Sequence, residues 1–326
     1  YNTVQRKERT FLMIEIQNVS KRYGNKLAVN DVSFTIKKGE ILGFLGRNGA
    51  GKSTTMNIVT GYISASSGRV LLDGHDILEE PREVKRRIGY LPEMPPLYMD
   101  MTVDEYLKFV CAIKDVKPSY VRSHLDDITE LIRITDVRKR LIKNLSKGYK
   151  QRVGMAQALV GNPEVVIMDE PTVGLDPKQI IEIRKLIKQL GEDHTIVLSS
   201  HILHEVADVC ERVVIINQGK IVAQDTLDNL TKNISDTSRF RLRIAGPERD
   251  VYKAIRDIPG TRSVDEMGCK EPESYDFLVE ADRGADIRRP LFNQMSKMGC
   301  PILMLRPMDI ELEDIFLQLT TDKGEE

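Results

Sequence analysis

Apolar and polar positions recur with two different periods along residues 13–230. Short apolar runs, typical of buried strands, are separated by longer segments whose apolar positions recur at helical spacing. The short runs predict strands near 13–19, 31–37, 40–46, 69–73, 87–91, 164–169, 195–199, 212–217 and 220–224. The longer segments predict helices near 52–61, 81–86, 102–114, 118–134, 147–160, 177–190 and 202–210. Strands that alternate with helices indicate an α/β fold with a largely parallel sheet covered by helices.

Two parts of this region depart from the alternation. The early strands are separated by short turns at Tyr23-Gly24 and at 37–40, which indicates hairpins and a small antiparallel β-subdomain. Residues 95–160 are mostly helical, and we expect a helical subdomain there, inserted into the α/β core.

The pattern changes near residue 231. Residues 231–238 are polar and are predicted to form a linker. Strands then follow near 239–244, 261–267, 274–281 and 301–306, with helices near 247–257, 285–298 and 310–319. The βαββαβ order is typical of a ferredoxin-like α+β domain, here over 239–326. This part holds no cluster of catalytic side chains, which favours a regulatory or dimer-forming module.

Composition excludes some classes of protein. The 326 residues are 41% hydrophobic and 30% charged, as in soluble globular proteins, and the formal net charge of −1 gives no overall attraction to nucleic acid. No apolar run approaches the roughly 18 residues of a membrane span. The chain is therefore expected not to be a channel itself, although it could dock on one.

The start of the chain and its cysteines add two expectations. Residues 1–12 are polar and basic without a signal-like apolar core, so we expect a tag remnant or a disordered extension before Met13. The four cysteines are far apart and lack metal-binding spacing, which favours free thiols in a reducing cytosol.

A glycine-rich turn between strand 40–46 and helix 52–61 carries the first candidate chemistry. It fits the pattern GxxxxGK[ST] and comprises Gly46, Arg47, Asn48, Gly49, Ala50, Gly51, Lys52, Ser53 and Thr54. Its glycines let backbone N–H groups point at phosphate oxygens, and the following helix adds the positive end of its dipole. Lys52 would reach the β- and γ-phosphates, and the Ser53 hydroxyl would bind Mg²⁺. The alternative is a glycine-rich turn without a ligand.

The apolar strand 164–169 ends in two carboxylates, Asp169 and Glu170. The carboxyl ends of parallel strands face the ligand crevice, so Asp169 would hold Mg²⁺ through a water and Glu170 would polarise an attacking water. An ordinary boundary between strand and turn is the alternative. Ser146 is a natural N-cap for the helix near 147–160, Pro177 can occupy the first position of the next helix, and His201 follows strand 195–199. Each of these three is ordinary when taken alone.

Residues 13–230 resemble the ATP-binding subunits of ABC transporters, because they carry that family's segments in its order: 46–54, 145–152, 167–171, 174–177 and 199–201. The resemblance implies ATP and Mg²⁺ as ligands. It also implies that Ser146 and Gly148 form a signature motif that contacts the γ-phosphate of ATP held by the other subunit of a head-to-tail dimer. This chain has LSKGY there, where the family's commonest form is LSGGQ.

The resemblance also assigns roles to single residues. Asp176 belongs to a loop that links the two sites across the dimer, His201 hydrogen-bonds the γ-phosphate and the attacking water, and Tyr23 stacks on adenine. Glu93 occupies a position where the family most often has Gln, and a carboxylate there could bind Mg²⁺ directly.

The implied function is an ATPase subunit that powers export through a separate polytopic membrane permease. ATP-driven closure of a homodimer, or of a dimer with a partner of the same fold, would drive transport, with the chain cytoplasmic and peripheral on the inner face of the cell membrane. We expect no nucleic-acid partner. The alternatives are a soluble ABC-type ATPase that acts on ribosomes or DNA, and a nucleotide-binding regulator that does not hydrolyse ATP.

Overall fold

The computed structural model describes residues 12–234, 237–282 and 284–308. The chain divides into two compact units, Tyr1–Leu227 and Asp228–Glu326. Within the described ranges, no helix combines the length and the apolar character that crossing a bilayer requires. The four cysteines are all free thiols, as expected.

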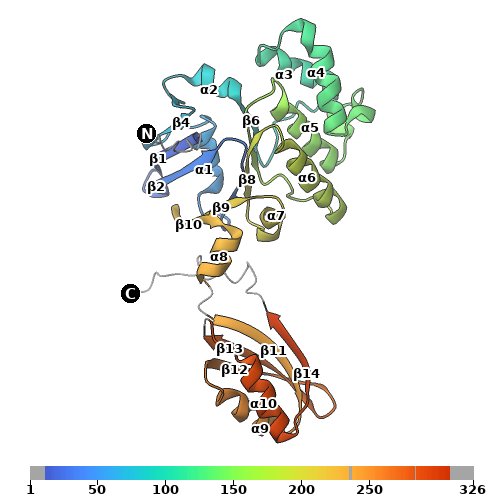
Figure 1. The fold of residues 1–326 in the computed structure, drawn as a ribbon. Coiled ribbons are helices and arrows are strands. Elements are labelled where there is room, and N and C mark those ends of the chain that lie inside the picture. The colour runs from blue at the N-terminus through green and yellow to red at the C-terminus, as the bar shows by residue number, and fades with distance from the viewer. Residues whose placement is uncertain (1–11, 235–236, 283, 309–326) are drawn as a thin grey trace, which may run out of the picture. The chain divides into compact units, whose positions relative to one another are not determined.

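A six-stranded sheet forms the centre of the first unit (Figure 1). Its spatial order is β10 (Lys220–Thr226), β9 (Arg212–Asn217), β3 (Ile41–Leu45), β8 (Thr195–Ser200), β7 (Val165–Asp169) and β6 (Ile88–Leu91). Neighbouring strands are parallel except β9 and β10. Every residue of β3, β7 and β8 is buried, as expected of strands covered on both faces. The predicted α/β arrangement with a largely parallel sheet is confirmed.

The smaller sheet of this unit is antiparallel, as expected. Its order is β2 (Lys26–Lys37), β1 (Leu12–Tyr23), β4 (Ser67–Leu72) and β5 (His75–Asp76). β1 and β2 are longer than the sequence pattern indicated, because their pairing continues to a tight turn in which Tyr23 faces Lys26 and Gly24 has a φ of 55°. Sequence reasoning missed β5, which is too short to produce a periodic pattern.

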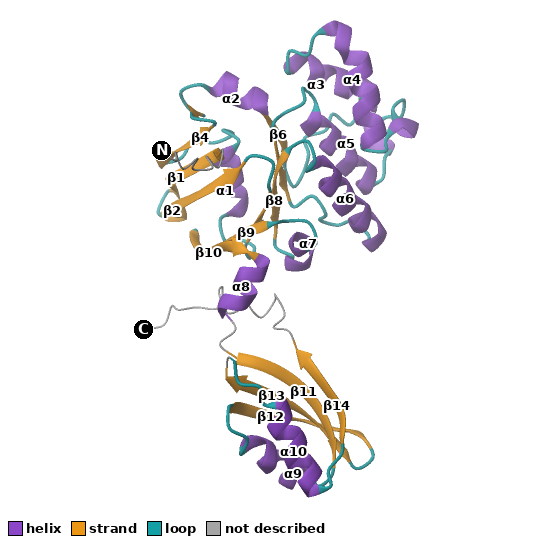
Figure 2. Cartoon of the chain, viewed as in Figure 1, coloured by secondary structure: helices purple, strands orange, loops and turns teal. Residues whose placement is uncertain are grey.

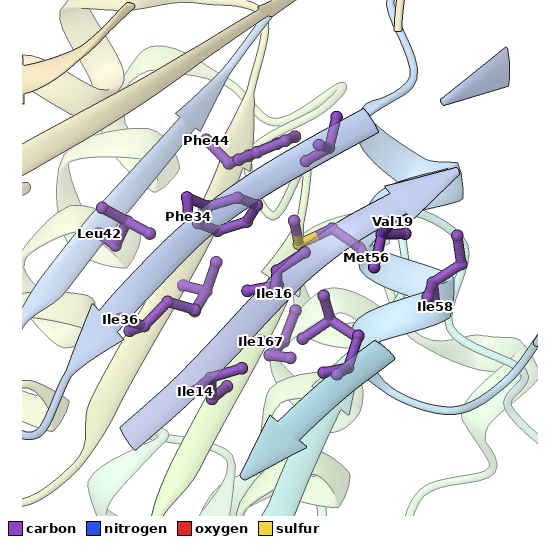
Figure 3. Packing of buried hydrophobic residues seen from close by; sticks show 14 of the residues in the cluster. Ile14, Ile16, Val19, Phe34, Ile36, Leu42, Phe44, Met56, Ile58 and Ile167 are labelled. Carbon is purple, nitrogen blue, oxygen red and sulfur yellow. The ribbon is translucent and has the colours of Figure 1, made fainter. Parts of the chain in front are cut away.

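Helix α1 (Lys52–Val59) joins the two sheets through one core. Its Met56 and Ile58 belong to the same buried cluster as Ile16 of β1, Phe34 of β2 and Ile167 of β7 (Figure 3). The rings of Phe34 and Phe44 stack with centroids 5.3 Å apart. This shared packing fixes the start of α1, and therefore the turn before it, against both sheets.

Figure 2 shows the other helices of the first unit, whose bounds lie close to the predicted ones. They are α2 (Pro81–Arg87), α3 (Val103–Ile113), α4 (Pro118–Leu131), α5 (Lys147–Leu159), α6 (Pro177–Leu190) and α7 (Leu203–Ala207), with short 3₁₀ turns at Thr135–Val137 and Ile142–Asn144. A capping box between Thr102 and Glu105 starts α3, and Pro118 occupies the first turn of α4. The segment 95–160 is therefore mostly helical, as its pattern indicated.

The second unit has a ferredoxin-like topology. Its elements run β11 (Thr237–Ala245), α9 (Glu248–Arg256), β12 (Thr261–Glu271), β13 (Ser274–Asp282), α10 (Arg288–Met298) and β14 (Ile302–Met308). The four strands form one antiparallel sheet in the order β12-β13-β11-β14. Leu242, Phe277 and Leu291 are fully buried in a core of its own. The helix expected near 310–319 and the extension before Met13 lie outside the described residues, apart from Leu12 in β1.

Most of the segment 231–238, predicted to form a linker, lies in regular secondary structure. Helix α8 (Leu227–Ile234) continues through its first half, and β11 begins at Thr237. Leu227, Leu230 and Ile234 keep helical spacing within an otherwise polar stretch, and Leu230 is buried. Polar composition therefore concealed an amphipathic helix. Residues 235–236 lie outside the described part.

Candidate functional site

Three parallel strands bring the candidate site together. In the order β3-β8-β7, the carboxyl ends of neighbouring strands meet at one edge of the sheet. The glycine-rich turn follows β3, Glu170 follows β7 and His201 follows β8. Segments more than a hundred residues apart in the sequence are thus adjacent because of the sheet order.

The glycine-rich turn has a backbone that requires glycine. Gly51, the N-cap of α1, has a φ of 113°, and a Cβ atom there would lie 2.8 Å from the carbonyl oxygen of Ala28. A side chain at this position would be strained and would collide with β2. The turn therefore approaches β2 more closely than any residue other than glycine at position 51 would allow.

A cavity of about 560 Å³ lies over this turn. It is lined by Tyr23, Lys26, Ala28, Asn48, Gly49, Gly51, Lys52, Ser53, Thr54, Glu93, Glu170, Val173 and His201. Most of the predicted site residues are therefore brought together. Gly46, Arg47 and Ala50 belong to the turn but do not line the cavity, and Ala50 is buried beneath it.

Glu170 is held between two nitrogen atoms. Its Oε1 lies 3.3 Å from Nζ of Lys52, and its Oε2 lies 2.8 Å from Nδ1 of His201. The side chains of Lys52 and Glu170 are each only 6% exposed, so water screens their attraction weakly. Lys52 Nζ also donates to the carbonyl oxygen of Gly46 at 2.9 Å. The carboxylate and the ammonium group are thus fixed in the lining of the cavity.

The backbone at Glu170 is in the left-handed region, with a φ of 49°. This conformation costs a non-glycine residue about 1–2 kcal/mol and persists only where the surroundings hold it. The Glu170 N–H donates to the carbonyl oxygen of Ser199 at 3.0 Å, and the Val173 N–H donates to the carbonyl oxygen of Glu170 at 3.2 Å. Strain at a residue in a cavity wall is a common property of functional sites.

The residues expected to hold Mg²⁺ fit a hard cation. Asp169 is 2% exposed, and among the described residues its Oδ1 has no hydrogen-bond partner. Ser53, Glu93 and Asp169 together line a second cavity of about 620 Å³, and Ser53 and Glu93 line the first as well. Hydroxyl and carboxylate oxygens are the ligands that Mg²⁺ prefers. In the described ranges, no three His, Cys, Asp or Glu side chains cluster so that they could hold a metal ion.

The predicted signature motif lies away from the cavity of its own chain. Ser146 caps α5 by accepting from the Tyr149 N–H at 3.3 Å, and Asp176 caps α6 by accepting from the Gln179 N–H at 3.0 Å. A Cβ atom on Gly148 would lie 2.8 Å from the Gln179 side chain. Ser146, Gly148 and Asp176 are not among the residues that line the cavity.

Two residues that depart from the common signature have local partners. Lys147 extends over the turn before α6, where a Cβ atom on Gly174 would come within 1.9 Å of its Nζ. Tyr149 donates its hydroxyl proton to Oδ2 of Asp136 at 3.1 Å, and this bond raises the pKa of Tyr149. Both side chains attach the start of α5 to neighbouring segments.

Sequence reasoning missed several residues of the site. Lys26 and Ala28 line the cavity because β2 pairs with β1, and the turn after Tyr23 was the available signal. Thr172 and Glu205 are buried beside Glu170 and His201. An acidic residue on the mostly apolar segment after His201 was the only sign of Glu205.

Known proteins resemble this chain over most of its length. The family described as ABC transporter matches residues 29–173. The chain is 32% identical to the linearmycin resistance ATP-binding protein LnrL of Bacillus subtilis over 94% of its length and 98% of the relative. It is 37% identical to the bacitracin transport ATP-binding protein BcrA of Bacillus licheniformis, over 71% of this chain and 75% of the relative. A dimeric ATP-binding cassette solved in a post-hydrolysis state with ADP and Pi matches with a TM-score of 0.61 and 26% identity, over 66% of this chain and 98% of that chain.

Proposed function

This chain belongs to the family of ABC transporter ATP-binding subunits, and on that premise we propose that it hydrolyses ATP to power export through a separate membrane subunit. The observation that carries the proposal is Glu170, which lies between Lys52 and His201 in the wall of the cavity beside the glycine-rich turn. The names of the relatives, which refer to antibiotic resistance and transport, favour export over a soluble ATPase that acts on ribosomes or DNA.

The proposed binding of ATP uses the whole wall of the cavity. N–H groups of residues 46–54 and the start of α1 would surround the phosphates, Lys52 would neutralise them, and Tyr23 would stack on adenine. Tyr23 is half exposed at the end of β1, with Nζ of Lys21 5.4 Å from its ring centroid. Mg²⁺ held by Ser53, Glu93 and Asp169 would supply neutralisation of charge on the triphosphate.

The proposed hydrolysis uses Glu170 and His201. Glu170 would polarise a water in line with the γ-phosphate, and His201 would hydrogen-bond the same water and phosphate. In this structure Lys52 contacts the Glu170 carboxylate. When Lys52 turns to the phosphates, the carboxylate oxygen that it contacted becomes available to water.

A second chain would complete the site. Ser146 and Gly148 do not line the cavity of their own chain, yet Ser146 is exposed at the N-terminus of α5, where N–H groups favour anions. We propose that they close over ATP bound to a partner in a head-to-tail homodimer. The similar ATP-binding cassette that was solved as a dimer with ADP and Pi supports the formation of a dimer.

The second cavity is the proposed docking place for the membrane subunit. Tyr62 and Met94 in its wall are 77% and 85% exposed, and Val110 of α3 also contributes to its lining. Exposed large apolar side chains around a hollow mark protein interaction sites. Because Ser53 and Glu93 line both cavities, a partner seated here would lie next to the nucleotide.

The test is purification of the full chain from detergent-solubilised membranes of its source cells. We expect a polytopic membrane protein to co-purify in stoichiometric amount, and the complex to hydrolyse ATP. Tyr62→Glu with Met94→Glu should abolish this association while the isolated chain still binds ATP. Recovery of the chain with ribosomes or DNA, and not with a membrane protein, would overturn the transport role.

A further inference from the structure

Glu205 is a buried carboxylate that the proposed reaction does not use. It lies on α7 and is only 4% exposed. Its Oε2 accepts hydrogen bonds from Oγ1 of Thr172 at 2.5 Å and from Oγ of Ser200 at 3.4 Å. Burial of a carboxylate is unfavourable unless hydrogen bonds compensate it, so these two hydroxyl groups account for its place in the fold.

Both hydroxyl groups belong to segments that carry the reactive side chains. Thr172 lies two residues after Glu170, within the turn closed by the bond from the Val173 N–H to the Glu170 carbonyl oxygen. Ser200 directly precedes His201, and its Oγ also accepts from the Ile202 N–H at 3.0 Å. A single carboxylate therefore connects the segment after β7 with the end of β8.

Helix α7, which carries Glu205, packs closely against β3. Its Val206 packs against Gly43 of β3 so closely that a Cβ atom on Gly43 would lie 2.1 Å from Cγ1 of Val206. Leu203 and Val206 are both buried, so the helix is held by apolar packing on either side of the carboxylate. Helix α7 therefore packs on β3, which leads into the glycine-rich turn, while its Glu205 bonds to the segments that carry Glu170 and His201.

The strained backbone of Glu170 explains why such a connection matters. A left-handed φ at a non-glycine residue relaxes unless neighbouring groups hold it. The Thr172–Glu205 bond restrains the turn just after Glu170, and the Ser200–Glu205 bond restrains the residue before His201. The 2.8 Å contact between Glu170 and His201 joins the two segments that these bonds restrain.

We propose that Glu205 is a positioning residue for ATP hydrolysis, acting through Thr172 and Ser200 on the relative placement of Glu170 and His201. This inference rests on the proposed function. Glu205 lines neither of the cavities described above. Its loss should therefore reduce turnover while ATP affinity is preserved, whereas a residue that only stabilises the fold would affect both together.

The test compares full-length variants at saturating ATP and measures nucleotide affinity separately. For Glu205→Leu we expect kcat to fall about 10- to 100-fold, because small misplacement of reacting groups has effects of this size. The affinity for ATP should stay within about threefold of the wild-type value, which is short of a tenfold change. Glu205→Gln keeps an oxygen acceptor and should recover a large part of the lost kcat. Glu192→Leu, the same exchange at an exposed position after α6, is the matched control.

A second variant keeps the proposal testable if Glu205→Leu does not fold. Thr172→Val removes only the hydroxyl group and should lower kcat with ATP affinity unchanged. Combined with Glu205→Leu it should add no further loss, because both changes break the same bond. Wild-type kcat in Glu205→Leu, or equal losses of kcat and ATP affinity in these variants, would overturn the positioning role. Glu170→Gln serves as the reference: if it hydrolyses ATP like wild type, the proposed function itself fails.

Discussion

Nζ of Lys52 lies 3.3 Å from Oε1 of Glu170, in an ion pair that is almost fully buried. The two residues follow different strands, β3 and β7, and meet because β8 alone separates these strands in the sheet. The ammonium group proposed to hold phosphate is therefore paired with the carboxylate proposed to activate water. In the proposed site, a triphosphate would compete with Glu170 for Lys52, so release of this ion pair would be coupled to nucleotide binding.

Glu170→Gln removes the charge of the proposed base and keeps its shape. We expect ATP affinity to be retained, because Lys52 loses a competing anion, and phosphate release to fall by about 100-fold or more. The ATP-bound dimer should accumulate and be visible by size-exclusion chromatography with light scattering. Undiminished phosphate release would refute the role of Glu170. Glu192→Gln, at an exposed position, should behave like wild type.

Glu93→Gln tests whether the carboxylate at this position binds the cation. Glu93 is exposed and lines both cavities, together with Ser53. Loss of one carboxylate ligand should raise the Mg²⁺ concentration for half-maximal hydrolysis by about tenfold, since anionic oxygens strengthen binding of hard cations. ATP binding without Mg²⁺ should be unchanged or tighter, because one negative charge beside the phosphates is gone. An unaltered Mg²⁺ titration would show that Glu93 is not a ligand.

Two substitutions of Ser146 distinguish its structural role as a helix cap from its proposed role in the dimer. Ser146→Ala removes the N-cap of α5 and should cost about 1 kcal/mol of stability. Because Ser146 lies outside the cavity of its own chain, ATP binding to the monomer should persist while dimer formation and turnover are lost. Ser146→Asn keeps a capping side chain and should restore the melting temperature but not the turnover. Recovery of turnover along with stability would show that only the cap matters.

His124 predicts a pH dependence of stability. Its Nε2 accepts a hydrogen bond from the Gly161 N–H at 2.9 Å, which requires an unprotonated nitrogen. Burial lowers the pKa of His124 from its ordinary value of 6.5, against a smaller raising effect of Asp127. The pKa of His124 is lower in the folded state than in the unfolded chain, so folding favours the neutral ring. The contribution of His124 to stability is therefore complete above pH 6.5 and is lost as the pH falls through the lowered pKa of the folded state.

Thermal unfolding of wild type and His124→Gln across roughly pH 5 to 8 measures this effect. The wild-type melting temperature should fall more steeply than that of the variant below the ordinary pKa of His124. Above that pH the difference between the two proteins should be constant. Parallel curves over the whole range would contradict the assignment.

The sequence predicted those parts of the fold that depend on local pattern. β3, β7 and β8 were recognisable because strands buried on both faces consist almost entirely of apolar residues. The turn at 46–54 was recognisable because its backbone requires glycine at fixed positions, as Gly51 shows. The order of the segments then indicated which residues share the site.

Other features depend on contacts between segments distant in the sequence. The Lys52–Glu170 ion pair and the Glu205–Thr172 bond form only because the sheet brings separate loops together. Helix α8, by contrast, was missed although its pattern is local. Its few apolar residues are spaced as in a helix, but polar residues surround them. The prediction for 231–238 was based on its polar composition, whereas the spacing of the apolar residues indicates a helix.

The position of Ser146 and Gly148 outside the cavity of their own chain has a consequence for mixtures of intact and altered copies. In the proposed dimer, each altered signature would inactivate a nucleotide site built mostly from an intact chain. In a cell that expresses an altered copy beside the intact one, the fraction of transport activity lost would therefore exceed the fraction of protein that is altered. Such a copy would act as a dominant inhibitor while its own phosphate-binding loop remained unchanged.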